Sequence, residues 1–284
     1  MSKNMSVAVY PGCSLNGSSR EYMESLRAVL NALEIPVNEV DDWNCCGASA
    51  AHNIDQDMAV ALPSRILAQT AKDGYSNLLV PCAACYNRLK HVQQEIKTSP
   101  EIRQKASVLL NQEINTPDTI VNILEYLQST VMPRLEGKTL KPVSKKVACY
   151  YGCLLVRPKG ISDEKQIEDP QGMDQIMASL GAEPVSWAFK TECCGAGFSV
   201  SNTTTVARLS SEILIDAADR GAEAIIVACP MCHSNLDMRR REIEKYSGRK
   251  FDIPVLYITQ AIGLALGIPA KKLGLQRHFV PVKI

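Results

Sequence analysis

The sequence lacks an excess of either charge: its 284 residues include 31 lysines and arginines against 30 aspartates and glutamates. This balance argues against nucleic acid or an anionic membrane surface as the main partner, because both select basic proteins. No run of about 18 or more apolar residues occurs, so no transmembrane segment is expected. The first residues hold too short an apolar stretch for a signal peptide, and we expect a soluble, cytoplasmic, globular protein.

Cysteine is abundant instead, and ten of the eleven cysteines form one five-residue pattern written twice. Each copy has a single cysteine, an adjacent pair and a C-x2-C motif. The single cysteine and the pair are separated by 31 residues in the first copy and 39 in the second, and the pair and the C-x2-C motif by 35 and 34. An odd cysteine count in a chain without a signal peptide favours metal or redox chemistry over a disulfide scaffold. Thiolates gathered from three places suit iron, zinc or copper(I), so we expect two similar metal sites. The proposed ligands are Cys13, Cys45, Cys46, Cys82 and Cys85, and Cys153, Cys193, Cys194, Cys229 and Cys232.

The repeat extends to the expected secondary structure. VAVYPGCSL at 7–15 matches VACYYGCLL at 147–155, and each is a short β-rich run that a glycine breaks just before the single cysteine. A helix, an apolar strand and the C-x2-C motif follow in the same order at 65–85 and 212–232. Both halves are expected to close with a proline-led helix, at 115–128 and 252–267, and 133–146 is the expected linker.

This order of elements predicts an α/β fold of two similar cysteine-rich domains related by internal pseudo-symmetry. The expected domains are residues 1–135 and 136–284, each with a small, mainly parallel sheet flanked by helices. The cysteine segments of each half follow strands, so they should converge at the carboxyl edge of the sheet, where ligands bind in such folds. Cys149, the remaining cysteine, lies on an expected strand and should be a small buried hydrophobic side chain.

Five thiolates are offered by each set, whereas a tetrahedral zinc ion or a cubane iron–sulfur cluster needs four. Adjacent residues in an extended chain point to opposite faces, so neither pair, Cys45–Cys46 or Cys193–Cys194, easily chelates a single ion. The surplus would fit an enlarged or non-cubane cluster, and a structural zinc ion in one set is the alternative. Glycines beside the cysteines either bring backbone N–H groups close to sulfur or only make turns. They are Gly12, Gly47, Gly152 and Gly195.

The motifs WNCCGA, PCAACYNRLK, YYGCLLVRP, KTECCGA and CPMCHSNLD resemble those of the CCG cysteine-rich domain family. A tandem pair of these domains is similar to the B subunit of heterodisulfide reductase, including its bacterial type, and the resemblance covers nearly the whole chain. It implies that each five-cysteine set holds a non-cubane [4Fe-4S] cluster, with a disulfide substrate bound between the two. The implied activity is reduction of a disulfide, or thiol oxidation in reverse, and each cluster would supply one of the two electrons.

The electrons must come from another protein, because the C-x2-C-x2-C-x3-C run of bacterial ferredoxins is absent. The resemblance implies a ferredoxin-like iron–sulfur subunit and a flavin-containing subunit as partners, with a small thiol or disulfide as substrate. The alternative is a non-catalytic electron-transfer subunit of a larger oxidoreductase or sulfur-oxidation complex. CCG domains of that kind often carry fused ferredoxin motifs, so their absence argues against the alternative.

Several charged or titratable residues near the cysteine motifs are candidates for further roles. His52 and His233 are candidate proton donors, although surface or hydrogen-bonding histidines are common. Four cationic residues follow cysteine motifs and could hold an anionic substrate, with solvated surface charge as the alternative. They are Arg88, Lys90, Arg157 and Lys159.

Overall fold

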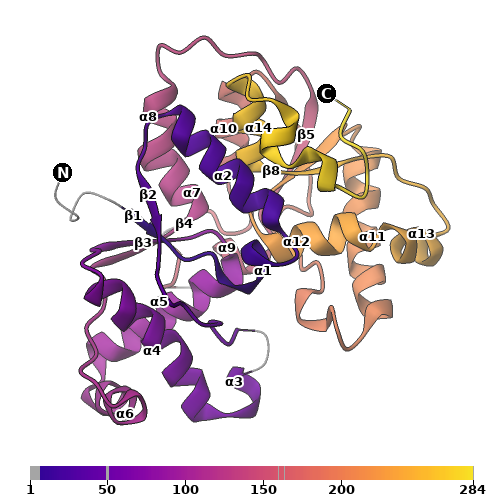
Figure 1. Ribbon diagram of the computed structural model, residues 1–284. Coiled ribbons are helices and arrows are strands. Elements are labelled where there is room, and N and C mark those ends of the chain that lie inside the picture. Colours follow the sequence, from indigo (N-terminus) through magenta and orange to yellow (C-terminus); the bar gives the residue numbers. More distant parts are fainter. Residues whose placement is uncertain (1–6, 49–50, 159, 163, 284) are drawn as a thin grey trace.

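Two α/β halves of similar build make up the molecule, which we describe from a computed structural model covering residues 7–48, 51–158, 160–162 and 164–283. Each half contains a four-stranded parallel sheet (Figure 1). The strand order is β2-β1-β3-β4 in the first sheet and β6-β5-β7-β8 in the second, so the sequence repeat is also a repeat of topology. The predicted α/β class with two parallel-sheet domains is therefore confirmed.

The first sheet has its most buried strands at the centre. β1 (Val7–Val9) pairs with β2 (Val37–Glu39) on one side and β3 (Asn77–Val80) on the other, and β4 (Thr119–Asn122) follows β3. Their short apolar runs, such as VAV and NLLV, suit strands that are covered on both faces. The helices of this half are α1 (Gly12–Asn16), α2 (Arg20–Ala32), α3 (Ala51–Ile54), α4 (Gln56–Lys72), α5 (Ala83–Thr98), α6 (Pro100–Leu110), α7 (Ile123–Tyr126), the π-helical η2 (Leu127–Val131) and α8 (Met132–Leu135).

The second sheet repeats this arrangement with β5 (Lys146–Tyr150), β6 (Glu183–Pro184), β7 (Ala224–Val227) and β8 (Val255–Tyr257). Its α-helices are α9 (Cys153–Val156), α10 (Gly172–Ser179), α11 (Thr203–Asp219), α12 (Pro230–His233), α13 (Arg240–Ser247) and α14 (Ile258–Ala265). The π-helical η4 (Ser234–Met238) and the 3-10 turns η3 (Ala196–Phe198), η5 (Ala270–Leu273) and η6 (Leu275–Arg277) complete it.

The two proline-led segments differ from the expectation of a single helix. Each begins with a strand, β4 or β8, that pairs in parallel with the preceding strand, and only then turns into a helix, α7 or α14. The strands contain β-branched or aromatic residues at 119–121 and 255–257, which favour a strand paired with the sheet over an isolated helical turn. The linker between α8 and β5 is residues 136–145, shorter than the expected 133–146 because α8 extends to Leu135 and β5 begins at Lys146; on that basis we propose a domain boundary at residues 135/136.

The halves share one continuous hydrophobic core. Helix α2 of the first half packs along α14 of the second (Figure 1). Between them Tyr22 stacks on Tyr257, with ring centroids 4.1 Å apart and planes 9° from parallel, and Ser25 Oγ lies 2.7 Å from Thr259 Oγ1. The Tyr22 hydroxyl also donates to the carbonyl oxygen of Ala228 at 2.9 Å. These buried contacts fix the position of one cysteine set relative to the other.

Candidate metal centres

All three cysteine segments of each half lie at the carboxyl edge of its sheet, as the strand pattern predicts. The single cysteines are in α1 and α9, directly after the central strands β1 and β5. The adjacent pairs lie in the loops after β2 and β6, and the C-x2-C motifs begin α5 and α12 after β3 and β7. All eleven cysteines are free thiols. The structure thus assembles two five-cysteine sets from the predicted residues.

The first set is buried at one end and open at the other. Cys46 Sγ lies 3.1 Å from Cys85 Sγ, and both residues are buried, whereas Cys13 and Cys45 are exposed. Hydrogen bonds from Cys45 and Cys85 hold the pKa of Cys46 well below its usual range, because they stabilise a thiolate there. The backbone N–H of Gly47 points to Cys45 Sγ at 3.4 Å. These hydrogen bonds therefore favour negative charge on the Cys46 sulfur.

The second set has the same plan. Cys194 Sγ lies 3.7 Å from Cys232 Sγ, both buried, and Cys193 is exposed. A hydrogen bond from Cys153, with help from the backbone N–H of Gly195, lowers the pKa of Cys193 to about 6. Asn235, which sequence reasoning did not identify, places its Nδ2 3.7 Å from Cys194 Sγ and 3.0 Å from the Cys194 carbonyl oxygen.

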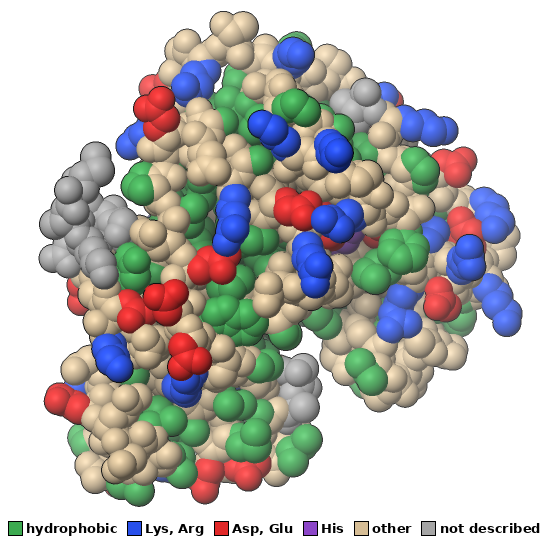
Figure 2. Space-filling model, in the orientation of Figure 1, with side chains coloured by type: hydrophobic (Ala, Val, Ile, Leu, Met, Phe, Trp, Pro, Cys, Tyr) green, Lys and Arg blue, Asp and Glu red, His purple; other side chains and the backbone are tan. Residues whose placement is uncertain are grey.

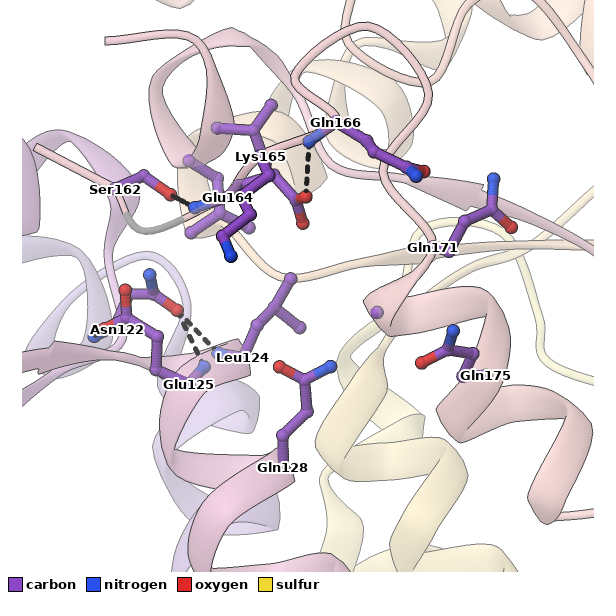
Figure 3. Close-up of a pocket in the computed structure, with 13 residues that line it drawn as sticks. Asn122, Leu124, Glu125, Gln128, Ser162, Glu164, Lys165, Gln166, Gln171 and Gln175 are labelled. Atoms are coloured by element: carbon purple, nitrogen blue, oxygen red, sulfur yellow. Dashed lines mark hydrogen bonds between the residues drawn. The ribbon is translucent and has the colours of Figure 1, made fainter. Parts of the chain in front are cut away.

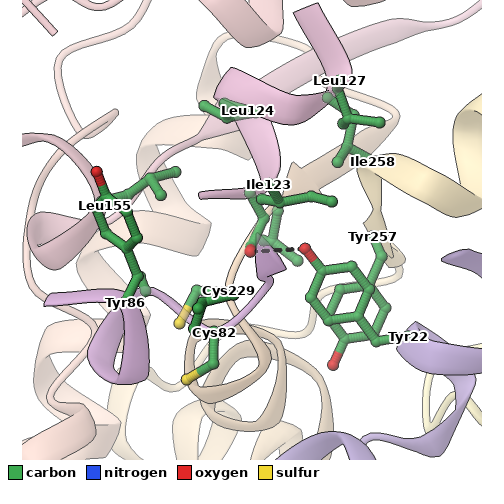
Figure 4. Close-up of a cluster of buried hydrophobic side chains, with 14 of the residues drawn as sticks. Tyr22, Cys82, Tyr86, Ile123, Leu124, Leu127, Leu155, Cys229, Tyr257 and Ile258 are labelled. Atoms are coloured by element: carbon green, nitrogen blue, oxygen red, sulfur yellow. Dashed lines mark hydrogen bonds between the residues drawn. The ribbon is translucent and has the colours of Figure 1, made fainter. Parts of the chain in front are cut away.

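The two sets meet at the domain interface. Cys82 and Cys229, the first cysteines of the two C-x2-C motifs, are both buried and lie close enough for each thiol to shift the pKa of the other. Figure 4 shows these sulfurs beside the Tyr22–Tyr257 stack. Within each motif the two thiols interact in the same way, Cys82 with Cys85 and Cys229 with Cys232. The sulfurs therefore form a row that runs from one set into the other, which the sequence alone did not predict.

Each half also packs its single-cysteine helix on the other half's C-x2-C helix. Helix α1 lies against α12, where Ser14 Oγ is 3.9 Å from Met231 Sδ, and α9 lies against α5. Beyond the cysteine pairs, apolar side chains are exposed at matching places: Ile54 and Met58 in the first half, Phe198 and Val200 in the second. Figure 2 shows the surface hollowed between the lobe of α3, α4 and α6 and the rest of the molecule.

Tyr10 and Tyr150 support the cysteine-pair loops from equivalent positions. Their hydroxyls donate to the carbonyl oxygens of Asn44 at 2.7 Å and Glu192 at 2.6 Å, the residues just before each pair. Burial raises the pKa of both tyrosines, so each remains a protonated donor. The signal for them was present in the sequence as YPGC and YYGC, a tyrosine three residues before each single cysteine.

The other candidate residues have defined places. Arg88 donates to the Ala59 carbonyl oxygen at 2.6 Å, Lys90 to that of Ile120 at 3.3 Å, and Arg157 pairs with Glu168 and Glu192, both at 3.0 Å. His233 is buried and stacks on Tyr257 at 4.3 Å. Cys149 is fully buried on β5, as expected of a small hydrophobic residue. Lys159 and the side chain of His52 lie outside the described residues.

A polar cavity of about 460 Å³ lies between the halves, with Leu155 and Val156 of α9 in one wall. Figure 3 shows amide side chains from both halves around it. None of its described lining residues is a cysteine, so it is separate from the sulfur row. The amides are Asn122, Gln128, Gln166, Gln171 and Gln175.

Known proteins with similar sequences agree with this description. The CCG cysteine-rich domain matches residues 7–90 and 147–237. Over 275 residues the chain is 30% identical to the 8-methylmenaquinol:fumarate reductase membrane anchor subunit of Wolinella succinogenes, covering 96% of each chain. It is 27% identical over 281 residues to the B subunit of the Ferredoxin/F(420)H(2)-dependent CoB-CoM heterodisulfide reductase of Methanosarcina acetivorans, covering 96% of this chain and 93% of that one.

A crystal structure of a hypothetical protein from Helicobacter pylori has the same fold, with a TM-score of 0.80 at 15% identity. The match covers 98% of this chain and 52% of that one, so this chain spans about half its length. Among the helices that the structure describes, each is too short or too polar to cross a membrane.

Proposed function

Because this chain belongs to the CCG cysteine-rich domain family, we propose that it is the catalytic iron–sulfur subunit of a heterodisulfide reductase-like complex. It is a subunit of the iron–sulfur oxidoreductase type, and its relatives are subunits of multi-protein complexes. The observation that carries the proposal is the sulfur row, in which two five-cysteine sets meet at Cys82 and Cys229. A single small substrate could reach both sets at once.

The donor set fits iron–sulfur clusters. Free thiols gather with sulfurs 3.1 Å apart in one set and 3.7 Å apart in the other, and backbone N–H groups point at Cys45 and Cys193. The ten cysteines would hold two [4Fe-4S] clusters of non-cubane type, with zinc in one set as the alternative occupant. When bound, the two clusters would each supply one electron, which matches the two electrons that a disulfide accepts.

Residues of the chain prepare the site for that chemistry. The exposed Cys13, Cys45 and Cys193 leave one side of the sets open to a substrate or partner. The buried Cys82–Cys229 contact keeps water from the place where the sets meet, so charges there interact more strongly than in water. An anionic substrate that used Arg157 would have to displace Glu168 or Glu192. We keep His52 as a proposed proton donor and Lys159 as a proposed contact for an anionic substrate.

The test uses anaerobically purified protein and electron paramagnetic resonance (EPR). The wild type should contain about eight irons per chain and show two paramagnetic centres on reduction. Cys194→Ser should remove one centre and abolish disulfide reduction, since it removes a buried ligand of the second set. Cys149→Ala, which alters a buried cysteine on β5 away from the sets, should keep both centres. A colourless, zinc-rich wild type, or a Cys194→Ser variant that still turns over, would overturn the proposal.

The higher identity to the fumarate reductase subunit favours a second candidate, an electron-transfer subunit of a larger oxidoreductase complex. The absence of a ferredoxin run does not exclude it, because that relative matches over 96% of both chains and leaves little length for such a domain. Candidate disulfides added to the reduced protein separate the two functions. Oxidation by a disulfide supports the reductase, whereas a protein that no disulfide oxidises but that passes electrons to another subunit supports electron transfer. We propose a cytoplasmic location in either case.

A further inference from the structure

A second pocket, of about 240 Å³, lies where the start of α2 meets η4 and the C-terminal segment. None of the described residues that line it is a cysteine, so it is distinct from the sulfur row. Three of its side chains carry atoms that bind metals: Glu21 from the first half, and His233 and Asp237 from the second. The pocket is lined by Gly17, Ser18, Arg20, Glu21, His233, Asp237, Met238, Arg277 and Phe279.

His233 presents a bare nitrogen lone pair here. Its Nε2 lies 3.1 Å from the carbonyl oxygen of Val255, which can only accept, so Nε2 carries the hydrogen. Because Nε2 carries the hydrogen, the free lone pair of the neutral ring is on Nδ1. Nδ1 has no hydrogen-bond partner in the described part of the chain, although the residue is only 2% exposed. Metal-binding histidines commonly donate their other ring N–H to a backbone carbonyl in this way.

Glu21 is placed to share an ion with His233. Its Oε1 lies 3.9 Å from His233 Nδ1, which is within the sum of about 4.1 Å for one metal–nitrogen and one metal–oxygen bond. The carboxyl is only 5% exposed, and burial raises its pKa. The Arg277 guanidinium stabilises the carboxylate only in part, since the pKa of Glu21 is still raised, so a bound cation would offset the remaining cost of burial.

Asp237 offers the third ligand. It follows His233 by four residues in the continuous helical run of α12 and η4, so both side chains lie on one face. The backbone N–H groups of Phe279 and Val280 donate to its two oxygens at 2.8 and 3.1 Å, which orients the carboxylate and leaves each oxygen one lone pair. Its charge also raises the pKa of Glu21, because the two carboxyl groups are close.

His278 is excluded as a ligand, although its ring lies near His233 and Asp237. Gln260 Oε1 accepts from the Tyr257 N–H at 2.9 Å, so Gln260 Nε2 is the donor that meets His278 Nε2 at 2.8 Å. His278 Nδ1 lies 3.3 Å from His233 Nε2, within hydrogen-bonding distance. Both of its nitrogens are therefore engaged.

We propose that Glu21, His233 and Asp237 bind a divalent first-row transition-metal ion, with water completing its coordination. A mixed set of carboxylates and one imidazole suits Mn²⁺, Fe²⁺ or Zn²⁺. Arg277, which also lines the pocket, is paired with Glu24 at 2.7 Å, so its charge does not oppose the cation fully. The ion would join the first half to the second one residue from Cys232 and would stabilise the interface that positions the two sets.

The test is a titration with Mn²⁺ of the anaerobically purified protein. The cysteine sets are left as they are after purification, with nothing added or removed. Mn²⁺ prefers oxygen and nitrogen to thiolates, so the sets compete little for it. The six-line EPR signal of free Mn²⁺ should reveal one bound ion per chain, and pulsed EPR should detect coupling to one imidazole nitrogen. Glu21→Gln should weaken binding by roughly 10- to 100-fold. Glu34→Gln, the same charge change at an exposed position just beyond α2, should leave it unchanged.

Two results would overturn the site: wild type that binds Mn²⁺ no better than Glu21→Gln, or bound Mn²⁺ without nitrogen coupling. Circular dichroism shows whether Glu21→Gln folds. If it does not, the nitrogen coupling in the wild type decides alone, because exposed carboxylates bind Mn²⁺ without an imidazole.

Discussion

At the scale of single residues, the glycines before the single cysteines make room for sulfur. A Cβ on Gly152 would lie 2.9 Å from Cys232 Sγ, closer than real Cβ contacts, and a Cβ on Gly12 would lie 3.5 Å from Cys85 Sγ, an ordinary contact. Both glycines have left-handed backbones, with φ of +69° and +59°. The sequence left open whether these glycines only make turns; the structure shows that they turn the chain and also lie against sulfur.

Alanine at the two positions should therefore have unequal effects. Both variants carry the cost of a left-handed alanine, about 1 kcal/mol, and the Cβ at position 12 also lies 3.2 Å from Tyr10 Cε1, but only Gly152→Ala displaces a sulfur of a cysteine set. We expect Gly152→Ala to lose about half of the iron per chain, and Gly12→Ala to keep most of it. Iron and acid-labile sulfide assays on the two purified variants measure this. Equal losses would show that the sulfur contact is unimportant.

The pairs Cys45–Cys46 and Cys193–Cys194 also differ between the halves. Cys193 has its pKa lowered to about 6 by a hydrogen bond from Cys153, whereas a hydrogen bond with Cys46 raises the pKa of Cys45 well above its usual range. Both residues are exposed. In protein stripped of metal, Cys193 should be a thiolate at pH 7 and Cys45 a thiol.

Iodoacetamide should therefore modify Cys193 well before Cys45 at pH 7, because the thiolate is the nucleophile. The rate at Cys193 should fall as the pH drops through about 6, where the thiolate takes up a proton. Peptide mass spectrometry against pH measures both rates in one sample. A midpoint near that of an ordinary thiol at Cys193, or equal rates at the two cysteines, would contradict the hydrogen-bond assignment.

At the scale of elements, the packing of α2 on α14 joins the two repeats. Tyr22 is the centre of this contact, since its ring stacks on Tyr257 and its hydroxyl reaches the carbonyl of Ala228, one residue before Cys229. Helix α2 belongs to the first half but holds the strand end that leads into the second half's C-x2-C motif. Stability and the position of Cys229 are therefore linked.

Truncation of this ring should be costly. Tyr22→Ala should lower the free energy of unfolding by about 3 to 5 kcal/mol, as large-to-small changes of buried aromatics do. Tyr246→Ala, at a half-exposed aromatic on α13, should change it by about 0.5 kcal/mol or less. Urea unfolding of both variants provides the comparison. A Tyr22→Ala loss no greater than that of Tyr246→Ala would contradict a shared interface.

Local pattern was enough to place the elements that carry cysteine. Glycine breaks after apolar runs located the ends of β1 and β5, and the helix-to-strand order located the C-x2-C motifs. The strands β4 and β8 were missed, because two or three apolar residues shortly after a proline fit a helix start as well as a strand. The α2–α14 contact and the roles of Asn235 and Tyr22 were also missed, since they depend on partners about 40 or more residues away.

At the scale of the whole molecule, duplication has produced one folded body with two cysteine sets. The halves share a core, and each single-cysteine helix lies on the other half's C-x2-C helix. Each cysteine set is therefore enclosed partly by residues of the other half. Under the proposed function, this arrangement would hold two one-electron centres at a fixed separation, as one two-electron substrate requires.

The joint action of the two sets is tested most directly by titrating the fully reduced protein with a small disulfide under anaerobic EPR. One disulfide per chain should remove both paramagnetic signals together and release two thiols, since each set supplies one electron. Loss of only one signal, or full retention of both with every disulfide tried, would contradict a shared substrate between the sets.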